Sequence, residues 1–127
     1  KNILKELLEE NSEDYFILFN NEVVGNFRFI WDEKLTGLSK ENQLKLHRIY
    51  LHPKAQGNKI GKTLLAWLDA KAIKKGYEII WLDAMDAQSK VFQFYIKLGY
   101  SYHSHVFLPF HFLHAAVRKM SQIYKKL

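Results

Sequence analysis

The 127-residue sequence contains no cysteine. It therefore cannot form a disulfide framework, a thiolate metal site or a cysteine nucleophile, and this absence fits a reducing compartment. No apolar run approaches the ~20 residues that span a bilayer, and no signal-peptide pattern opens the chain. These absences predict a cytoplasmic protein with no membrane partner.

The composition is that of a globular domain with an excess of positive charge. Hydrophobic residues make up 48% and aromatic residues 15%, which favours a packed core over disorder. At this length we expect one domain, 1–127, that buries about 60–70% of its unfolded-chain surface. The formal net charge of +6 would attract nucleic acid, an acidic membrane face or a nucleotide cofactor, and charge alone does not choose among them.

One stretch organises the rest of the chain. Residues 43–51 have a strand pattern, and 60–75 have the apolar periodicity of an amphipathic helix. The loop between them carries two glycines. A strand that ends at such a loop aims backbone N–H groups and the positive end of the helix at one point, which suits a phosphate or pyrophosphate. Lys59 and Lys62 add charge beside that point.

Strand and helix patterns alternate elsewhere. Residues 2–11 have helical periodicity. Asn20 and Asn21 tolerate the positive φ of a two-residue hairpin turn. Because strand–helix–strand crossovers are right-handed, strands 43–51 and 78–83 should run parallel. The other expected elements are strands at 15–19, 22–30 and 100–108, an irregular segment at 31–42, and a helix at 90–98 with Ser89 as its N-cap.

Two motifs resemble the signatures of one family. The run Gln56-Gly57-Asn58-Lys59-Ile60-Gly61 resembles the pyrophosphate loop of the GCN5-related N-acetyltransferases (GNAT), in which Arg/Gln-x-x-Gly-x-Gly/Ala is usual. Lys59 stands where the middle glycine is usual. Further on, Phe94-Tyr95-Ile96-Lys97-Leu98-Gly99-Tyr100 resembles the second signature, a helix that ends in Phe-Tyr-x-x-x-Gly-Phe/Tyr. The two signatures stand in the family's order.

The resemblance implies an α/β (α+β) fold. Its central sheet would be mixed and mostly antiparallel, with about six strands, splayed in the middle and flanked by helices. The family normally has a strand and a further helix before 2–11, and the chain begins with Lys, so we expect a truncated N-terminal part. The family also implies a last strand near 118–125, antiparallel to the one before it. The apolar residues from 113 to 127 would equally line one face of a helix.

The resemblance also implies acetyl-coenzyme A as co-substrate. The backbone at 57–61 would hold its pyrophosphate, with Gln56 and the lysines beside it. Backbone groups of strand 43–51 would pair with the pantetheine arm, and the N–H of Tyr50 or Leu51 would stabilise an oxyanion. Gln88 stands where relatives often carry an asparagine that contacts the coenzyme. The expected coenzyme-binding residues are Ile49, Tyr50, Leu51, Gln56, Gly57, Asn58, Lys59, Ile60, Gly61, Lys62 and Gln88.

The same resemblance supplies two catalytic candidates. Tyr95 matches the tyrosine that protonates the departing thiolate; a phenol with a pKa near ~10 suits a thiolate of similar basicity once water is excluded. Its alternative role is that of a packed aromatic. His47 stands where many relatives carry a glutamate and would take the proton of the acceptor amine, or else be structural. Four further histidines cluster late in the chain and match no metal motif, so we expect no metal; they could line the acceptor side and are His103, His105, His111 and His114.

The expected activity is transfer of acetyl from acetyl-CoA to a primary amine of a small molecule or peptide, by direct attack in a ternary complex. Glu33, Glu41 and Asp83 could attract a cationic acceptor, or be ordinary surface. One alternative is a coenzyme-binding or sensor domain without catalysis. Another is a basic nucleic-acid-binding module, against which stands the lack of any RNA-binding signature. We expect no nucleic-acid partner, and a homodimer stays open.

Overall fold

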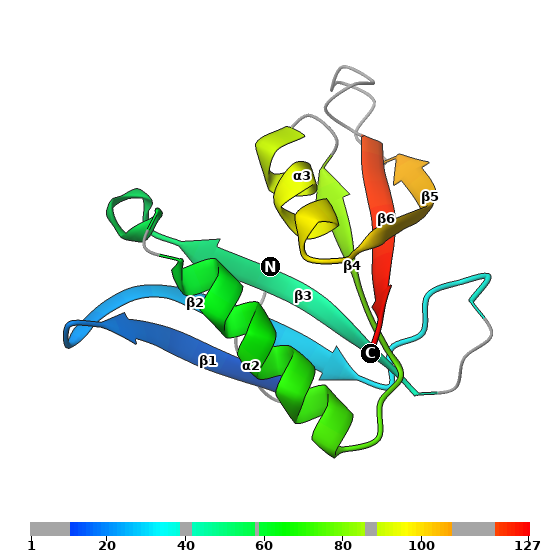
Figure 1. Cartoon of the computed structure of the whole chain (residues 1–127), viewed down its shortest axis with the longest axis horizontal. Helices are drawn as coiled ribbons and strands as arrows, with labels where there is room; N and C mark the ends of the chain where they lie inside the picture. The colour runs from blue at the N-terminus through cyan, green and yellow to red at the C-terminus, as the bar shows by residue number, and fades with distance from the viewer. Residues whose placement is uncertain (1–10, 39–41, 58, 86–88, 108–118) are drawn as a thin grey trace.

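In the residues that it describes, the computed structural model has one mixed sheet with two helices packed beside it (Figure 1). It describes residues 11–38, 42–57, 59–85, 89–107 and 119–127. In these residues the sheet has the strand order β1-β2-β3-β4-β6-β5. The elements are β1 (Ser12–Phe19), β2 (Glu22–Trp31), β3 (Gln43–Leu51), the 3-10 turn η1 (Pro53–Ala55), α2 (Ile60–Lys74), β4 (Ile79–Met85), α3 (Ser89–Lys97), β5 (Ser101–Phe107) and β6 (Lys119–Lys126).

The strands β3 and β4 hold the two halves of the sheet together over a short distance. They run parallel, as predicted, and pair only from Gln43 opposite Ile79 to Lys45 opposite Trp81. Every other neighbouring pair is antiparallel. Since β3 continues to Leu51 and β4 to Met85, the two strands diverge beyond this seam (Figure 1). The predicted splayed, mostly antiparallel sheet is therefore confirmed.

The local signals in the sequence explain most element boundaries. Asn20 and Asn21 both have positive φ, at 51° and 64°, and join β1 to β2 in the predicted tight hairpin. The helix α2 ends before Gly76, whose φ is 80°, and Tyr77 N–H donates to the Ala72 carbonyl as in a Schellman C-cap. Ser89, predicted as the N-cap of α3, is instead its first residue.

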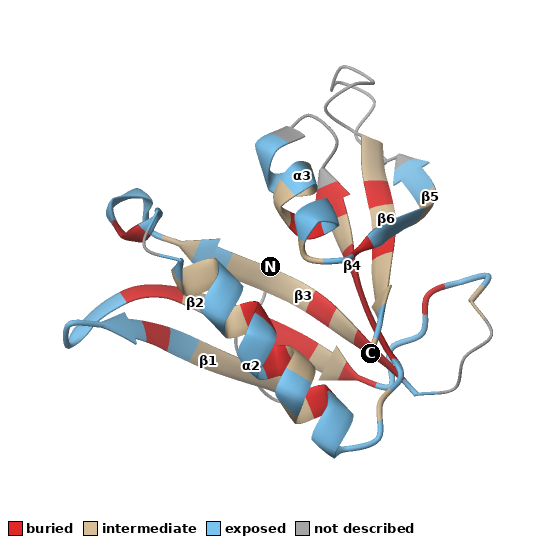
Figure 2. Ribbon diagram, in the orientation of Figure 1, coloured by how far each residue is buried: buried red, intermediate tan, exposed pale blue. Residues whose placement is uncertain are grey.

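The two faces of the sheet carry separate cores. Figure 2 shows the buried positions in red along the strands and along α2. Leu44, Leu46 and Ile80 pack with buried residues of α2 on one face. Leu35, Ile79 and Trp81 form a smaller cluster. It lies on the other face, because alternate residues of β4 point to opposite sides.

A buried glutamine fastens the loop that follows β2. The Gln43 Oε1 atom accepts from Leu35 N–H at 2.8 Å, and its Nε2 donates to the Leu38 carbonyl at 2.9 Å. The loop is thereby held against the beginning of β3, over the smaller core cluster.

The final segment is a strand. β6 lies between β4 and β5 and is antiparallel to both, so the family-based expectation of a last strand is confirmed and the helical alternative is wrong for 119–126. The predicted helix at 2–11 lies outside the described residues except for Asn11. No helix among the described residues has the length and apolarity to cross a membrane.

Candidate active site

The loop between β3 and α2 has the geometry of an anion site. The backbone takes positive φ at Gly57 (86°) and at Lys59 (59°), and α2 begins directly afterwards at Ile60. The side chain of the N-cap residue, Lys59, makes no capping hydrogen bond, and no acidic residue stands in the first turn of α2. The first N–H groups of a helix lack partners within the helix, so here they and the positive end of the helix dipole are available to an anion.

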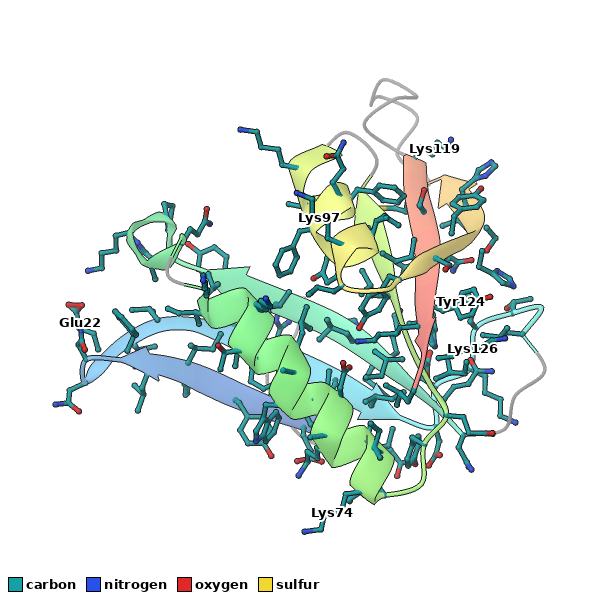
Figure 3. All side chains as sticks on the ribbon, in the orientation of Figure 1. Glu22, Lys74, Lys97, Lys119, Tyr124 and Lys126 are labelled. Atoms are coloured by element: carbon teal, nitrogen blue, oxygen red, sulfur yellow. The ribbon has the colours of Figure 1, made fainter. Side chains whose placement is uncertain are left out.

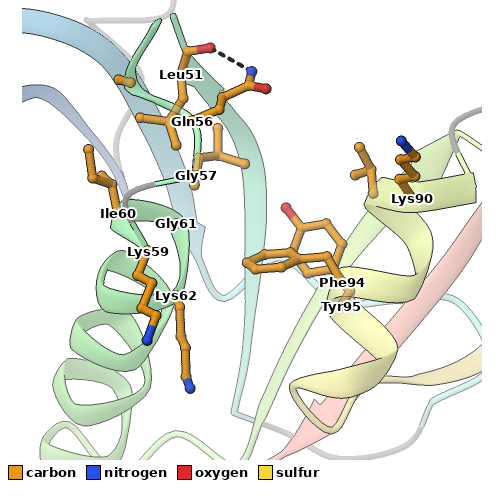
Figure 4. A pocket seen from close by; sticks show the side chains of 13 residues that line it. Leu51, Gln56, Gly57, Lys59, Ile60, Gly61, Lys62, Lys90, Phe94 and Tyr95 are labelled. Carbon is orange, nitrogen blue, oxygen red and sulfur yellow. Dashed lines mark hydrogen bonds between the residues drawn. The ribbon is translucent and has the colours of Figure 1, made fainter. Parts of the chain in front are cut away.

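Lys59 adopts this backbone without the freedom of glycine. A left-handed conformation costs a non-glycine residue roughly 1–2 kcal/mol. Its side chain makes no capping hydrogen bond, and in Figure 4 it extends along α2 beside Lys62. Lys59 thus takes a left-handed turn at the position where the resembling motif usually has glycine, and adds a cation to it.

A cavity of about 520 Å³ opens between this loop and α3 (Figure 4). Its described lining includes three lysines and no carboxylate, which favours a polyanionic ligand. Gly61 lies at its narrow side: a Cβ there would be 3.4 Å from Phe94 Cζ. The lining residues are Ile49, Leu51, Ala55, Gln56, Gly57, Lys59, Ile60, Gly61, Lys62, Lys90, Val91, Phe94 and Tyr95.

Gln56 turns back onto β3. Its Nε2 donates to the Leu51 carbonyl at 3.2 Å, the dashed line in Figure 4. In this state the side chain steadies the loop and occupies a carbonyl at the end of β3. A ligand that pairs with this carbonyl would have to compete with the Gln56 amide.

The backbone groups of β3 divide between its two neighbours. His52 N–H donates to the Val24 carbonyl, and the register between Gly25 and Leu51 and between Asn26 and Tyr50 is continuous with this bond. Hydrogen-bonding residues alternate along an antiparallel pair. The backbone N–H and C=O groups of Tyr50 therefore point to β2, and those of Ile49 and Leu51 point to the gap towards β4.

The contact at Gly25 agrees with this assignment. A Cβ there would lie 2.0 Å from Tyr50 O, which places that carbonyl against β2. The Tyr50 side chain is 52% exposed and lines neither cavity described here. Of the two predicted oxyanion donors, the geometry therefore favours Leu51.

A second cavity, of about 280 Å³, lies where β3 and β4 part. The register of β2 with β3 shifts so that Arg28 opposes Arg48 and Phe29 opposes Leu46, which leaves His47 as the extra residue of a β-bulge. Both cavities share Ile49, Val91 and Tyr95, so they meet at Tyr95. The second cavity is lined by Leu46, His47, Arg48, Ile49, Leu82, Asp83, Ala84, Val91, Tyr95 and Met120.

Tyr95 is only 5% exposed and packs edge-on against Phe94 and Tyr100, with ring centroids 5.4 and 5.5 Å apart. Burial raises the pKa of Tyr95 to about 12. An ordinary thiol has a pKa of about 8.5. The pKa of the Tyr95 phenol in the free protein is therefore not close to that of the thiol, as an unperturbed phenol would have been. Proton transfer from Tyr95 to a thiolate becomes favourable only where the same burial also raises the pKa of the thiol.

The structure brings most of the sequence-predicted residues together and separates others. Asn58 and Gln88 lie outside the described residues, as do His111 and His114. His103 and His105 are on β5, where His105 contacts the Tyr102 hydroxyl at 2.7 Å; neither lines a cavity. Among the described side chains no group of three or more histidines and carboxylates could hold a metal ion.

Sequence reasoning missed part of the wall that α3 contributes. Lys90, Val91 and Phe94 line the larger cavity together with Tyr95. The signal was available, because positions 91, 94 and 95 share one face of a helix. Of these residues the resemblance implies a catalytic role for Tyr95 alone, so the others were not predicted to form the wall.

Comparison with known proteins agrees with this geometry. Residues 2–100 match the model of the acetyltransferase (GNAT) family. An uncharacterized N-acetyltransferase of Lactobacillus delbrueckii subsp. lactis is 26% identical over 104 residues, which are 81% of this chain and 60% of that protein. The chain therefore spans about 60% of the length of this curated relative.

Solved structures share the fold. A GNAT family acetyltransferase from Elizabethkingia anophelis with acetyl-CoA bound has a TM-score of 0.77 at 18% identity, covering 100% of this chain and 84% of its own. Arabidopsis thaliana Naa50, in complex with the bisubstrate analogue CoA-Ac-MVNAL, has a TM-score of 0.74 at 17% identity, with coverage of 90% and 72%. With the family match, the six-stranded splayed sheet and the loop before α2 in agreement, this chain belongs to the acetyltransferase (GNAT) family.

Proposed function

We propose that this protein transfers an acetyl group from acetyl-CoA to a primary amine of a small molecule or peptide, by direct attack within a ternary complex. The observation that carries the proposal is the meeting of two cavities at Tyr95, in the gap between β3 and β4. The larger suits the coenzyme, and the smaller gives an amine a separate approach to the same point. Two proteins of the same fold were solved with acetyl-CoA and with a coenzyme–peptide bisubstrate analogue, which supports a site that holds coenzyme and acceptor together.

The coenzyme would be held chiefly by main chain. Residues 57–61 and the N-terminus of α2 would bind the pyrophosphate, with Lys59, Lys62 and Lys90 around it. The outward backbone groups of Ile49 and Leu51 would pair with the pantetheine amides as an added strand does. For this the Gln56 amide would leave the Leu51 carbonyl, where it now donates.

The chemistry then falls to groups at the junction. His47 would accept a proton from the ammonium form of the acceptor, and the freed nitrogen lone pair would attack the thioester carbonyl carbon. The Leu51 N–H would stabilise the resulting oxyanion. When the C–S bond breaks, the sulfur keeps the electron pair and Tyr95 would supply a proton to it. The attacking nitrogen then gives up its second proton to solvent and becomes the neutral amide, and the Tyr95 phenolate takes a proton back from solvent.

A pair of measurements tests the proposal. Thermal unfolding with acetyl-CoA at ~100 times its dissociation constant should show about 2.7 kcal/mol of added stability. Release of free thiol should then depend on an added primary amine. Stabilisation without turnover across a broad amine panel would indicate the non-catalytic coenzyme-binding domain. Failure of acetyl-CoA to stabilise the protein at all would overturn the proposal.

A further inference from the structure

The smaller cavity contains one carboxylate that the reaction described above does not use. Asp83 lies on β4, two residues beyond the last pair with β3, on the same face as Trp81. It is the one acidic residue among the described residues that line either cavity. The cationic wall of the larger cavity and the carboxylate of the smaller one thus lie on either side of Tyr95.

The hydrogen-bond acceptor capacity of the Asp83 carboxylate is only partly used. Its Oδ2 atom lies 3.3 Å from Lys45 Nζ. Its Oδ1 atom is buried and accepts no hydrogen bond from the part of the chain that the structure describes. A carboxylate can accept about four hydrogen bonds. The Asp83 side chain lines the cavity and is 27% exposed. Because Oδ1 itself is not exposed, a group with several N–H donors in the cavity would reach this acceptor capacity once the side chain turns.

The neighbouring cations use only part of that capacity, through the pair of Lys45 with Oδ2. Lys45 is held in place by the Trp81 ring, with Nζ 4.8 Å from the ring centroid. Arg48 also lines the cavity, but its guanidinium donates to Asn26 and Asp14, each at 3.2 Å, on the strands that lie away from β4. These two hydrogen bonds anchor the Arg48 guanidinium on the side of β3 that lies away from Asp83.

We propose that Asp83 binds the ammonium group of the acceptor in the smaller cavity and selects amines that carry a positive charge. The inference rests on the proposed function and names its substrate class. The ammonium donates to the carboxylate while the amine is close to His47, which also lines the cavity. Once His47 has taken a proton, the neutral amine is bound less tightly by Asp83 and is free to attack.

The test compares acceptors of similar size that differ in charge. Benzylamine and ethylamine are protonated at neutral pH, whereas aniline and hydroxylamine are not. For the parent enzyme KM should be lower for the charged member of each pair. Asp83→Asn should raise KM for the charged amines about 10- to 100-fold, with the KM of acetyl-CoA nearly unchanged. KM for the uncharged acceptors should stay within about twofold.

Two further variants separate charge from structure. Asp83→Glu keeps the charge and should retain the preference for charged amines. Lys45→Met keeps a long chain on the Trp81 ring but frees Asp83, so KM for benzylamine should fall. A rise in that KM instead, matching Asp83→Asn, would assign the effect to the ion pair as a structural element and overturn the inference.

The possible failures are distinguishable. If Asp83→Asn raises KM equally for charged and uncharged acceptors, or changes neither, the inference is wrong while the proposed function stands. If the parent binds acetyl-CoA but acetylates no amine in the panel, the proposed function fails and the inference fails with it. Thermal unfolding of each variant with acetyl-CoA reports whether it is folded.

Discussion

The two cavities that meet at Tyr95 are built from different materials. The larger is formed by a glycine-containing loop, the start of a helix and the outward backbone groups of β3, with lysines around them. The smaller is formed by side chains from β3, β4, α3 and β6, including one histidine and one carboxylate. Main-chain geometry recognises what all members of a family bind, whereas side chains on a scaffold can change with the acceptor. The sequence motifs therefore identify the coenzyme end and are silent about the acceptor.

Filling the larger cavity should have the largest effect. Gly61→Leu would place a branched side chain where a Cβ already lies 3.4 Å from Phe94 Cζ and 4.0 Å from Leu51 Cδ1. We expect the affinity for acetyl-CoA to fall by at least ~100-fold, since overpacking costs typically 1–3 kcal/mol and the ligand contacts are lost as well. Isothermal titration calorimetry measures the affinity for acetyl-CoA. Gly61→Ala is the control: it should bind the coenzyme and gain up to about 1 kcal/mol in stability.

Removing the hydroxyl at the junction should affect chemistry and leave coenzyme binding intact. Tyr95→Phe should lower kcat by about 100-fold, the lower range for loss of a general acid, with little change in the dissociation constant of acetyl-CoA. Single-turnover kinetics separate the two quantities. Equal rates for variant and parent would remove Tyr95 from the mechanism and leave it as a packed aromatic.

The pKa of Tyr95 adds a pH signature. Because burial raises it to about 12, kcat should not decline through loss of the Tyr95 proton up to about pH 10. The folded state holds a proton that the unfolded chain releases above about pH 10, so the free energy of unfolding should fall as the pH rises from about 10 to about 12. Tyr95→Phe should show a smaller fall, measured by urea unfolding across this range.

On the acceptor side, loss of the proposed base should have a moderate effect. His47→Gln should lower kcat by roughly 10- to 100-fold, because water can replace the imidazole in part. Added imidazole should restore some of the rate, as a small base can enter a cavity of about 280 Å³. A rate that is unaffected by the substitution would assign His47 a structural role in the bulge.

The smallest expected effect tests the lysines of the coenzyme end. Lys90→Gln should weaken acetyl-CoA binding by about two- to fivefold, since a solvent-exposed ion pair contributes about 0.2–1 kcal/mol. The loss should shrink at high salt. Lys97→Gln is the matched control on the same helix, because Lys97 lines neither cavity. Equal losses for the two variants would indicate a general effect of net charge.

The fold was predictable where local chemistry agrees with tertiary structure. The Asn20-Asn21 hairpin and the exact bounds of β3 follow from turn chemistry and strand pattern. The start of β1 does not, because Glu13 and Asp14 are poor strand formers. They are held there by distant partners: Glu13 accepts from Trp31 Nε1, and Asp14 pairs with Arg28 at 2.9 Å. Tertiary contacts override propensity at this strand.

The candidate site was likewise predictable only where a local requirement restricts the residue type. Glycine is needed where φ is 86°, so Gly57 leaves a readable trace in the sequence. A β-bulge at His47 and a carboxylate beside a strand gap require no particular neighbours along the chain. Their roles depend on the point where β3 and β4 diverge. That point is set by the three residue pairs at the start of the two strands.

That short seam leaves an open border inside the sheet rather than at its margin. Beyond Lys45 and Trp81, no strand of the described residues lies between the facing backbones of β3 and β4, and the Leu51 carbonyl accepts a hydrogen bond from the Gln56 side chain. Exposed strand edges invite pairing with any extended chain. In the proposed binding mode the coenzyme would lie between β3 and β4 as an added strand does. While bound, it would prevent other peptides from pairing with these exposed strand edges.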